Sequence, residues 1–475
     1  MTLGSTIIRL SFGGGVLKSP ERLDTSILNQ LTAHEQRFGL APAHTDTAFR
    51  FQNLIRNLHQ ATGQRVVVLI DEYDKPILDN LQTPEVALEM RDGLRNLYSV
   101  LKESDAHLKF VFLTGVSKFS KVNLFSGLNH LKDITIDKRF SALCGYTETD
   151  LDTVFAPELH NVDRQILRDW YNGYNWDGEA VYNPFDLLLY CDTGQLRPHW
   201  FETGTPTFLV DFLASHHWFT PDLAHLQTSQ TLLSTFDVGN IRPEALLWQT
   251  GYLTFHQIAE TRPGRWNYTL GYPNLEVEAA LNEVLLPAYG ADFHAAYTAR
   301  SQTEAALMQH NLAHLRDSFY ALFASIPHDW YRNNPLAEYE GYYASVFYSQ
   351  LAALGLDTRV EDATNKGRID LALRYQNHVY LFEFKVIAGT ALPGQSAQAA
   401  EASNASQPVL KDATEGSPTE STTPAPAAHS PALQQLPAKG YADKYRAPGV
   451  GITLIGITFS KQERNIIGWE TLSLS

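Results

Sequence analysis

The sequence predicts a multidomain α/β protein built from three regions. Continuous apolar runs alternate with helical stretches in the first third of the chain, helical patterns dominate the middle, and strand patterns return near the carboxyl end. A length of 475 residues corresponds to two to four domains at roughly 100–200 residues each. The changes of pattern place the regions at residues 1–146, 147–330 and 331–475.

The composition excludes several classes of protein. There are 37 Lys and Arg against 52 Asp and Glu, a formal net charge of −15, so any nucleic-acid site has to be a local basic pocket. Two cysteines cannot build a disulfide framework. No apolar run approaches the roughly 20 residues of a membrane-spanning helix. Arg9 interrupts the only candidate signal peptide. We therefore expect a soluble, cytoplasmic protein with no membrane partner.

The first region has the pattern of a parallel sheet buried on both faces. The apolar runs Ile7–Phe12, Val66–Ile70 and Leu108–Leu113 are continuous rather than alternating, which is typical of parallel strands covered by helices. The expected helices lie before residue 38, at 46–61 and at 84–103.

Polar residues follow two of these strands. Asp71 and Glu72 follow the second run and Thr114 follows the third, so all three are expected at the carboxyl edge of the sheet, where ligands bind in open α/β sheets. In P-loop ATPases such an aspartate holds Mg²⁺ and such a glutamate positions water. The alternative is that the acidic residues only cap helices and solvate loops.

The middle region predicts helices around one hairpin. The segments GYLTF at 251–255 and RWNYTLGYPN at 265–274 have strand patterns, and LEVEAALNEVLL at 275–286 has helical spacing. Helix, two-stranded wing and helix together predict a winged-helix-like module.

The last region predicts a second α/β domain with an insertion. Residues 388–431 are rich in Ala, Ser, Thr, Pro, Gln and Gly and nearly lack large apolar residues, which predicts a disordered insertion. The expected ordered elements are helices at 338–354 and 432–445 and strands at 358–362, 369–375, 379–387 and 451–459.

Two of these strands carry the sharpest chemical pattern. Asp370 lies in GRIDLAL. The segment EFK, which contains Glu383 and Lys385, begins thirteen residues after Asp370. Side chains alternate along a strand, so Glu383 and Lys385 share a face about 6–7 Å apart, and hairpin pairing would bring Asp370 beside Glu383. Two carboxylates bind Mg²⁺ through hard oxygen ligands, and an ammonium can hold the attacking water, as metal-dependent phosphodiester hydrolysis requires. Glu340 and Gln435, on the flanking helices, could reach the same site.

A simpler interpretation is a half-exposed strand face with an ion pair. The apolar flanks VYLF and VI instead predict a central strand covered on both faces, where buried charges require a partner or a function.

The last region resembles the PD-(D/E)XK nuclease superfamily in Glu340, Gly367–Asp370, Glu383–Lys385, Gln435 and Tyr441-Ala442. This resemblance implies a restriction-endonuclease-like domain in which Asp370 and Glu383 bind metal and Lys385 is the catalytic lysine. It further implies that Glu340 is the helix carboxylate and that Gln435 is the polar residue of the following helix. The insertion 388–431 departs from the short link that such proteins usually have.

The rest of the chain resembles the AAA-ATPase-like proteins to which such a domain is fused. The resemblance rests on VVVLIDEYDKPI, FLTGVSKFSKVNLFSGLN, RFSALCGY, YNGYNWDGEAVYNPFDLL, LLWQTGYLTF and LGYPNLEVE, in that order. It implies a P-loop NTPase-like sheet with Asp71, Glu72 and Thr114 at the nucleotide site.

One departure concerns the phosphate-binding loop. In the family, a G-x-x-x-x-G-K-[ST] loop precedes the strand corresponding to Ile7–Phe12, where this chain begins. Gly13–Gly15 and Lys18 form no Gly-Lys-Ser/Thr sequence, so the P-loop NTPase-like sheet is incomplete and little remains to hold ATP. We expect weak or no ATP hydrolysis.

The sequence thus predicts an AAA-ATPase-like protein with a Mg²⁺-dependent nuclease domain acting on DNA or RNA. One alternative is a non-catalytic regulatory protein with two degenerate sites that binds a partner protein. Another is an ATP-binding switch protein of which this chain is an N-terminal truncation.

Overall fold

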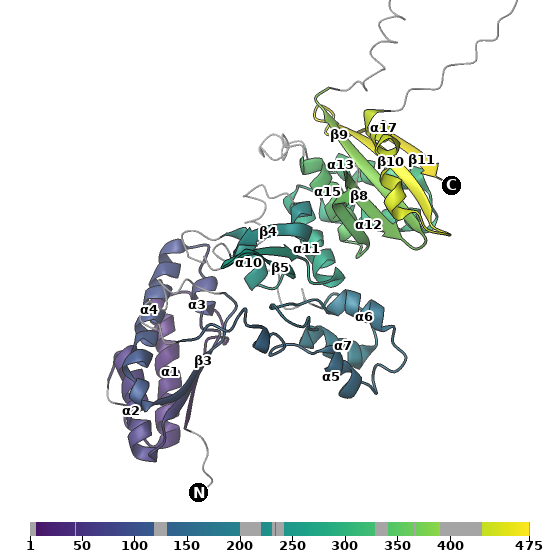
Figure 1. Cartoon of the computed structure of the whole chain (residues 1–475). Helices are drawn as coiled ribbons and strands as arrows, with labels where there is room; N and C mark the ends of the chain where they lie inside the picture. The colour runs from purple at the N-terminus through teal and green to yellow at the C-terminus, as the bar shows by residue number, and fades with distance from the viewer. Residues whose placement is uncertain are drawn as a thin grey trace, which may run out of the picture. The chain divides into compact units, whose positions relative to one another are not determined.

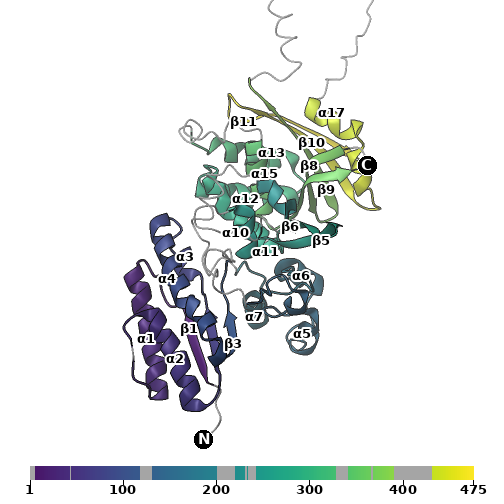
Figure 2. The same ribbon diagram turned by 60° about the vertical axis from the view of Figure 1, so that its left-hand side comes forward.

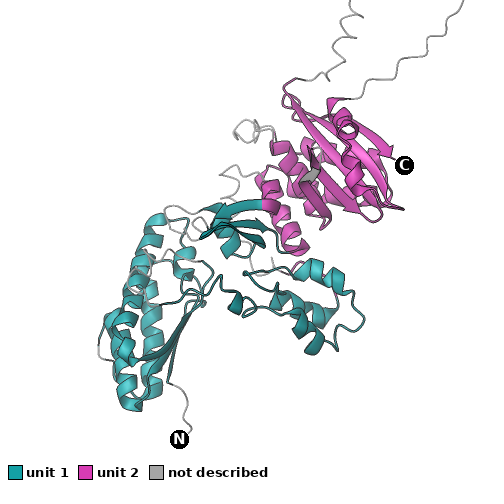
Figure 3. Ribbon diagram, in the orientation of Figure 1, with its two compact units in different colours: residues 1–194, 226–273 teal, residues 195–225, 274–475 magenta. Residues whose placement is uncertain are grey.

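The computed structural model describes most of the chain, as two compact units (Figures 1 and 3). The first unit comprises Met1–Gly194 and Leu226–Pro273, and the second comprises Gln195–His225 and Asn274–Ser475. The described residues are 6–42, 44–117, 131–199, 220–229, 233, 242–327, 341–364, 367–389 and 430–474.

The first unit begins with a parallel sheet. Its strands, in the spatial order β1-β2-β3, are β1 (Ile7–Ser11), β2 (Val66–Asp71) and β3 (Leu108–Leu113). The main helices are α1 (Pro20–Phe38), α2 (Thr47–Thr62) and α4 (Pro84–Glu103), with the short α3 (Lys75–Leu78) and η1 (Asp105–His107). These strands and helices confirm the predicted α/β pattern of the first region.

The helices of this unit begin and end where capping residues permit. The Ser19 side chain accepts a hydrogen bond from the Arg22 amide at the start of α1, and Asp46 accepts one from Phe49 at the start of α2. Gly39 and Gly63 end the two helices in the left-handed conformation, with φ of 67° and 66°, which glycine adopts without steric cost.

The helices α1, α2 and α4 lie side by side on one face of the sheet (Figure 2). In β2, Val66, Val68 and Ile70 are buried, whereas the alternate residues Val67 and Leu69 are half-buried. The expectation of a sheet buried on both faces is therefore not met by the described part of the chain. A continuous apolar run predicts a strand but does not specify how many faces helices cover.

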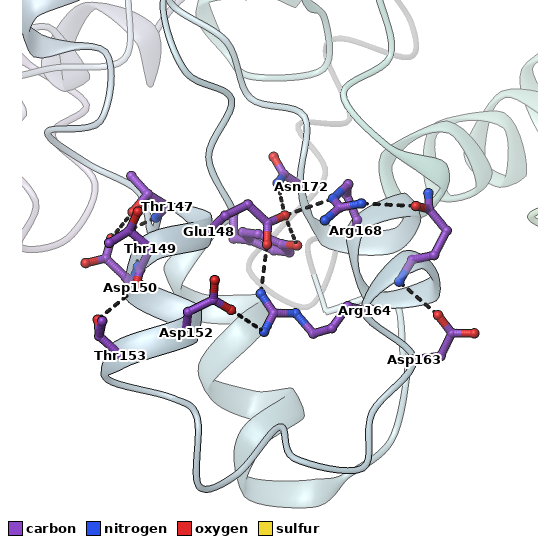
Figure 4. A network of polar contacts seen from close by, with 12 residues as sticks. Thr147, Glu148, Thr149, Asp150, Asp152, Thr153, Asp163, Arg164, Arg168 and Asn172 are labelled. Carbon is purple, nitrogen blue, oxygen red and sulfur yellow. Dashed lines mark hydrogen bonds and ion pairs between the residues drawn. The ribbon is translucent and has the colours of Figure 1, made fainter.

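A helical segment follows in the first unit and is held by charged contacts. Its elements are η2 (Lys138–Phe140), α5 (Glu148–Thr153), α6 (Arg164–Tyr171) and α7 (Pro184–Thr193). Glu148 accepts hydrogen bonds from Arg164, Arg168 and Tyr182 at 2.7–2.8 Å (Figure 4). Burial raises the pKa of Glu148, but these hydrogen bonds outweigh burial and lower it to about 2.

A small antiparallel sheet completes the first unit, in the order β4-β6-β5. Its elements, with the helix that precedes the hairpin, are β4 (Leu226–Ser229), α10 (Pro243–Gln249), β5 (Thr254–Arg262) and β6 (Arg265–Gly271). The predicted hairpin is present as β5 and β6. The third strand, β4, was not predicted, because LQTS lacks an apolar run. The winged-helix-like interpretation stays a prediction.

The second unit contains a five-stranded mixed sheet in the order β11-β10-β9-β8-β7. The strands are β7 (Asp357–Thr364), β8 (Gly367–Tyr375), β9 (His378–Ile387), β10 (Gly451–Ser460) and β11 (Asn465–Leu474). The helices are η4 (Thr220–His225), α11 (Leu275–Ala288), α12 (Phe293–Met308), α13 (Leu312–Ala324), α15 (Gly341–Ala352), α17 (Pro431–Ala438) and η6 (Tyr441–Tyr445). Strands β9 and β10 are parallel and the other pairs are antiparallel.

Helices cover both faces of the central strand β9. On one face, the rings of Phe382 and Phe384 lie 5.2 and 5.1 Å from that of Phe347 in α15. On the other face, Leu381 belongs to a buried cluster with Leu433 of α17. The charged residues Glu383 and Lys385 alternate with the two phenylalanines, so they lie on the α17 face.

The carboxyl-terminal region departs from the expected pattern at its last strand. The last strand, β11, was not predicted: only its first two residues are buried, and residues 467–474 are half-buried or exposed, so it lacks a continuous apolar run. The insertion expected at 388–431 falls almost entirely outside the described residues. Within the described ranges, no helix has the length and apolar character needed to cross a membrane.

Candidate active site

The candidate site lies where the pairing between β8 and β9 ends. The antiparallel ladder runs from Tyr375 opposite His378 to Leu371 opposite Phe382. One residue beyond this pair, the Asp370 carboxylate accepts a hydrogen bond at its Oδ2 from the backbone amide of Phe384, at 2.7 Å. The side chain of Asp370 therefore takes the place of a backbone carbonyl and is fixed against β9, beside Glu383.

Glu383 is a buried carboxylate with one uncompensated oxygen. Its side chain is 2% exposed, and Oε1 lies 3.6 Å from Nζ of Lys385, whose side chain is 42% exposed. Oε2 is buried and has no hydrogen-bond partner among the described residues. Burial, followed by the charge of Asp370, raises the pKa of Glu383 to about 7, although Lys385 and Lys439 act in the opposite direction.

A glycine in β10 brings α17 close to this carboxylate. Gly456 is paired with Glu383 in the parallel register, and a Cβ atom at position 456 would lie 2.5 Å from the backbone nitrogen of Leu433. Only glycine therefore allows the first turn of α17 to pack on the sheet here. Ser430 caps that turn, and its own amide donates to Glu470 at 2.8 Å.

The donor set fits a magnesium ion better than a metal held only by protein. In the part of the chain that the structure describes, no group of three or more His, Cys, Asp and Glu side chains could hold a metal. Mg²⁺ is usually bound by one or two carboxylates together with waters and substrate phosphates. Asp370 and Glu383 supply two carboxylates, and the uncompensated Oε2 of Glu383 needs a cation or donor.

The two helix residues of the predicted site have different outcomes. Glu340 lies outside the described residues. Gln435 lies half-buried in α17, the helix that packs on the Glu383 face of the sheet. Sequence reasoning missed Lys439, directly after α17, although its charge acts on Glu383. The only sequence feature that marks this lysine is its place before Gly440-Tyr441. A lysine before a glycine is common at the ends of helices, so this feature does not indicate a function.

The predicted nucleotide-site residues also meet, at the edge of the first sheet. Oδ1 of Asp71 accepts a hydrogen bond from the Thr114 hydroxyl at 2.8 Å, and Oδ2 lies 3.3 Å from Arg9. Glu72 has a left-handed backbone, with φ of 56°. Burial, then the charges of Asp74 and Asp71, raises the pKa of Glu72.

Asp74 holds the segment that follows β3. It is fully buried and accepts hydrogen bonds from the Val116 amide at 3.1 Å, from the Ser117 hydroxyl at 2.6 Å and from the Ser117 amide. A Cβ at Gly115 would lie 2.2 Å from this carboxylate. Sequence reasoning missed this role, whose only signal is the second aspartate of DEYD.

Comparisons with known proteins match the two predicted domains, in the predicted order. Residues 4–125 match a family model described as a predicted AAA-ATPase, and residues 338–469 match the PD-(D/E)XK nuclease superfamily. A relative from Azotobacter chroococcum mcd 1, named "Uncharacterized protein in vnfD 5'region", is 53% identical over 468 residues, which are 98% of this chain and 83% of the relative. No solved structure matches the chain.

Proposed function

We propose that the second unit of this chain hydrolyses phosphodiester bonds. The premise is that the chain belongs to a family of AAA-ATPase-like proteins with a PD-(D/E)XK nuclease superfamily domain at the carboxyl end. The substrate is DNA or RNA, and Asp370 and Glu383 are the residues that would hold Mg²⁺. Lys385 is the catalytic lysine of this proposal.

The observation that carries the proposal is the buried, uncompensated Oε2 of Glu383 beside Asp370. Burying an ionised carboxylate is costly unless a cation or hydrogen-bond donors compensate it. Lys385 approaches only Oε1, at 3.6 Å, so this ion pair leaves the buried Oε2 without a partner among the described residues. A divalent ion would compensate both carboxylates at once.

Each residue of the site has a separate task in this proposal. The Phe384 amide fixes Asp370 against β9, so the spacing of the two carboxylates depends on the backbone and not on a mobile side chain. The half-exposed Lys385 contacts both Glu383 and solvent, and it holds the attacking water by donating a hydrogen bond. A bound Mg²⁺ would act as a Lewis acid on the scissile phosphate.

Cleavage assays on the purified full chain test the proposal. Labelled DNA and RNA, single- and double-stranded, are incubated with Mg²⁺ or EDTA. Asp370→Asn and Lys385→Met should each reduce cleavage by about 100-fold or more. The matched controls are Asp317→Asn, an exposed acid of α13, and Lys102→Met, an exposed lysine of the first unit.

Two results would overturn the assignment. Cleavage that survives in both site variants would locate the activity elsewhere. An intact wild-type chain that cleaves none of these substrates would leave the regulatory, partner-binding alternative.

A further inference from the structure

We propose that Lys439 binds a phosphate of the nucleic-acid strand next to the carboxylate pair, because α17 delivers its side chain across the start of β8. This role deepens the proposed nuclease function and rests on it. Nothing in the sequence pattern had assigned a function to this lysine.

The packing of α17 determines where Lys439 lies. The helix starts against Gly456, beside Glu383, and contacts both β9 and β10. At its other end, Cδ of Lys439 lies 3.4 Å from where a Cβ at Gly367 would be, and the Tyr441 hydroxyl lies 2.7 Å from the same point. Gly367 opens β8 with φ of 150°, three residues before Asp370. A Cβ at position 367 would overlap the Tyr441 hydroxyl but only touch the stem of Lys439. The glycine therefore lets Tyr441 pack over the start of β8, and Lys439 lies beside it.

The charge of Lys439 reaches the site while its side chain remains exposed. It is one of two lysines, with Lys385, whose charges favour the ionised form of Glu383. In the described ranges, Lys439 forms no ion pair of its own and is exposed to solvent. Lysine acts as a flexible point charge in phosphate binding.

The charge balance of the site favours a phosphate ligand for this lysine. When Glu383 is ionised, Asp370 and Glu383 together carry two negative charges, and the charges of Lys385 and Lys439 favour that ionised form. A divalent ion at the carboxylates would add two positive charges. One phosphodiester at the ion and a neighbouring phosphate of the same strand would balance these.

The competing explanation is that Lys439 only stabilises the end of α17. Lysines near helix C-termini interact favourably with the helix dipole, and Lys439 is the C-cap residue of α17. That role predicts a lower melting temperature on substitution but no change in nucleic-acid binding.

Salt-dependent binding distinguishes the two explanations without any turnover. The full-length wild type, Lys439→Gln, Lys439→Arg and Lys439→Glu are titrated against fluorescently labelled duplex DNA in EDTA, by anisotropy, at several salt concentrations. Losing one phosphate contact should reduce the slope of log Kobs against log salt by about 0.9. Lys439→Arg should retain the wild-type slope, and Lys439→Glu should bind more weakly than Lys439→Gln.

The control is Arg316→Gln, an exposed cation of the same unit on α13 that pairs with Asp317. It should bind as the wild type does. Equal slopes and affinities for Lys439→Gln and the wild type would overturn the inference, whatever the melting temperatures. An equal reduction of slope and affinity in Arg316→Gln would also overturn it, because it would indicate a general electrostatic attraction between the unit and DNA.

The outcome can be separated from that of the proposed function. If the wild type cleaves nucleic acid and Lys439→Gln has wild-type binding and KM, the nuclease proposal stands and the inference falls. If the wild type never cleaves but Lys439→Gln lowers the slope, the phosphate contact stands and the nuclease proposal falls. A wild type that neither cleaves nor binds overturns both.

Discussion

Replacing Glu383 by glutamine tests the electrostatics of the carboxylate site directly. Glutamine has nearly the same shape and no charge. Burial, with the charge of Asp370, raises the pKa of Glu383 from its ordinary 4.5 to about 7. The folded chain therefore holds a proton on Glu383 between these two pH values, which the unfolded chain has released.

The sign of the effect follows from proton linkage. Because the folded state binds more protons in this window, the stability of the second unit should fall as the pH rises from 4.5 through 7. At about 1.4 kcal/mol per pH unit, the ionised Glu383 costs about 3 kcal/mol above pH 7. Glu383→Gln removes this cost, so the variant should gain stability relative to the wild type only toward high pH.

Thermal unfolding in EDTA at pH 5 and pH 8 measures the difference. A change of 1 kcal/mol shifts Tm by about 2–4 °C in a domain of 150–250 residues. The Tm of Glu383→Gln minus that of the wild type should therefore rise by about 5–10 °C between the two pH values. Asp317→Asn, on exposed α13, should show no such rise. A Tm difference for Glu383→Gln that is the same at both pH values would refute the reasoning.

Three further outcomes concern metal, packing and nucleotide. Mg²⁺ should raise the Tm of the wild type at pH 8 and that of Asp370→Asn much less, because one ligand is lost; equal shifts would contradict this. Asp74→Ala should destabilise the first unit by about 2–4 kcal/mol in urea unfolding, since the Ser117 and Val116 donors lose their buried acceptor; wild-type stability would show that they find other acceptors. Phosphate-release assays should show the same background rate of ATP hydrolysis for the wild type and Glu72→Gln, because the 475 residues contain no Gly-Lys-Ser/Thr sequence. A rate that the wild type has and Glu72→Gln lacks would contradict the expectation.

Local patterns predicted the strands of both predicted sites, β2 and β3 in the first unit and β8 and β9 in the second. The continuous runs at Val66–Ile70 and Leu108–Leu113 correspond to β2 and β3, since apolar strands are recognisable without knowing their neighbours. The proximity of Asp370 and Glu383 also follows from local rules. Strand alternation and a two-residue turn place them on one face of a hairpin.

The parts that could not be predicted depend on contacts between distant segments. Lys439 lies beside the start of β8 because Gly456 lets α17 lie close to the sheet and Gly367 leaves room for Tyr441, and neither glycine has a local pattern that indicates this. Asp74 acts on backbone donors after β3, which sequence spacing does not bring together. The edge strand β11 lacks the continuous burial by which the other strands were recognised.

The close approach of α17 at Gly456 has a practical consequence. A single methyl group at this position would push α17 away from the sheet, because its nearest neighbours are the backbone atoms of Leu433 and not a flexible side-chain tip. It would admit water to Glu383 while leaving every charge in place. The lack of a side chain at position 456 thus determines how far solvent reaches the Glu383 carboxylate. Substitutions there would change solvent access without changing any ionisable group.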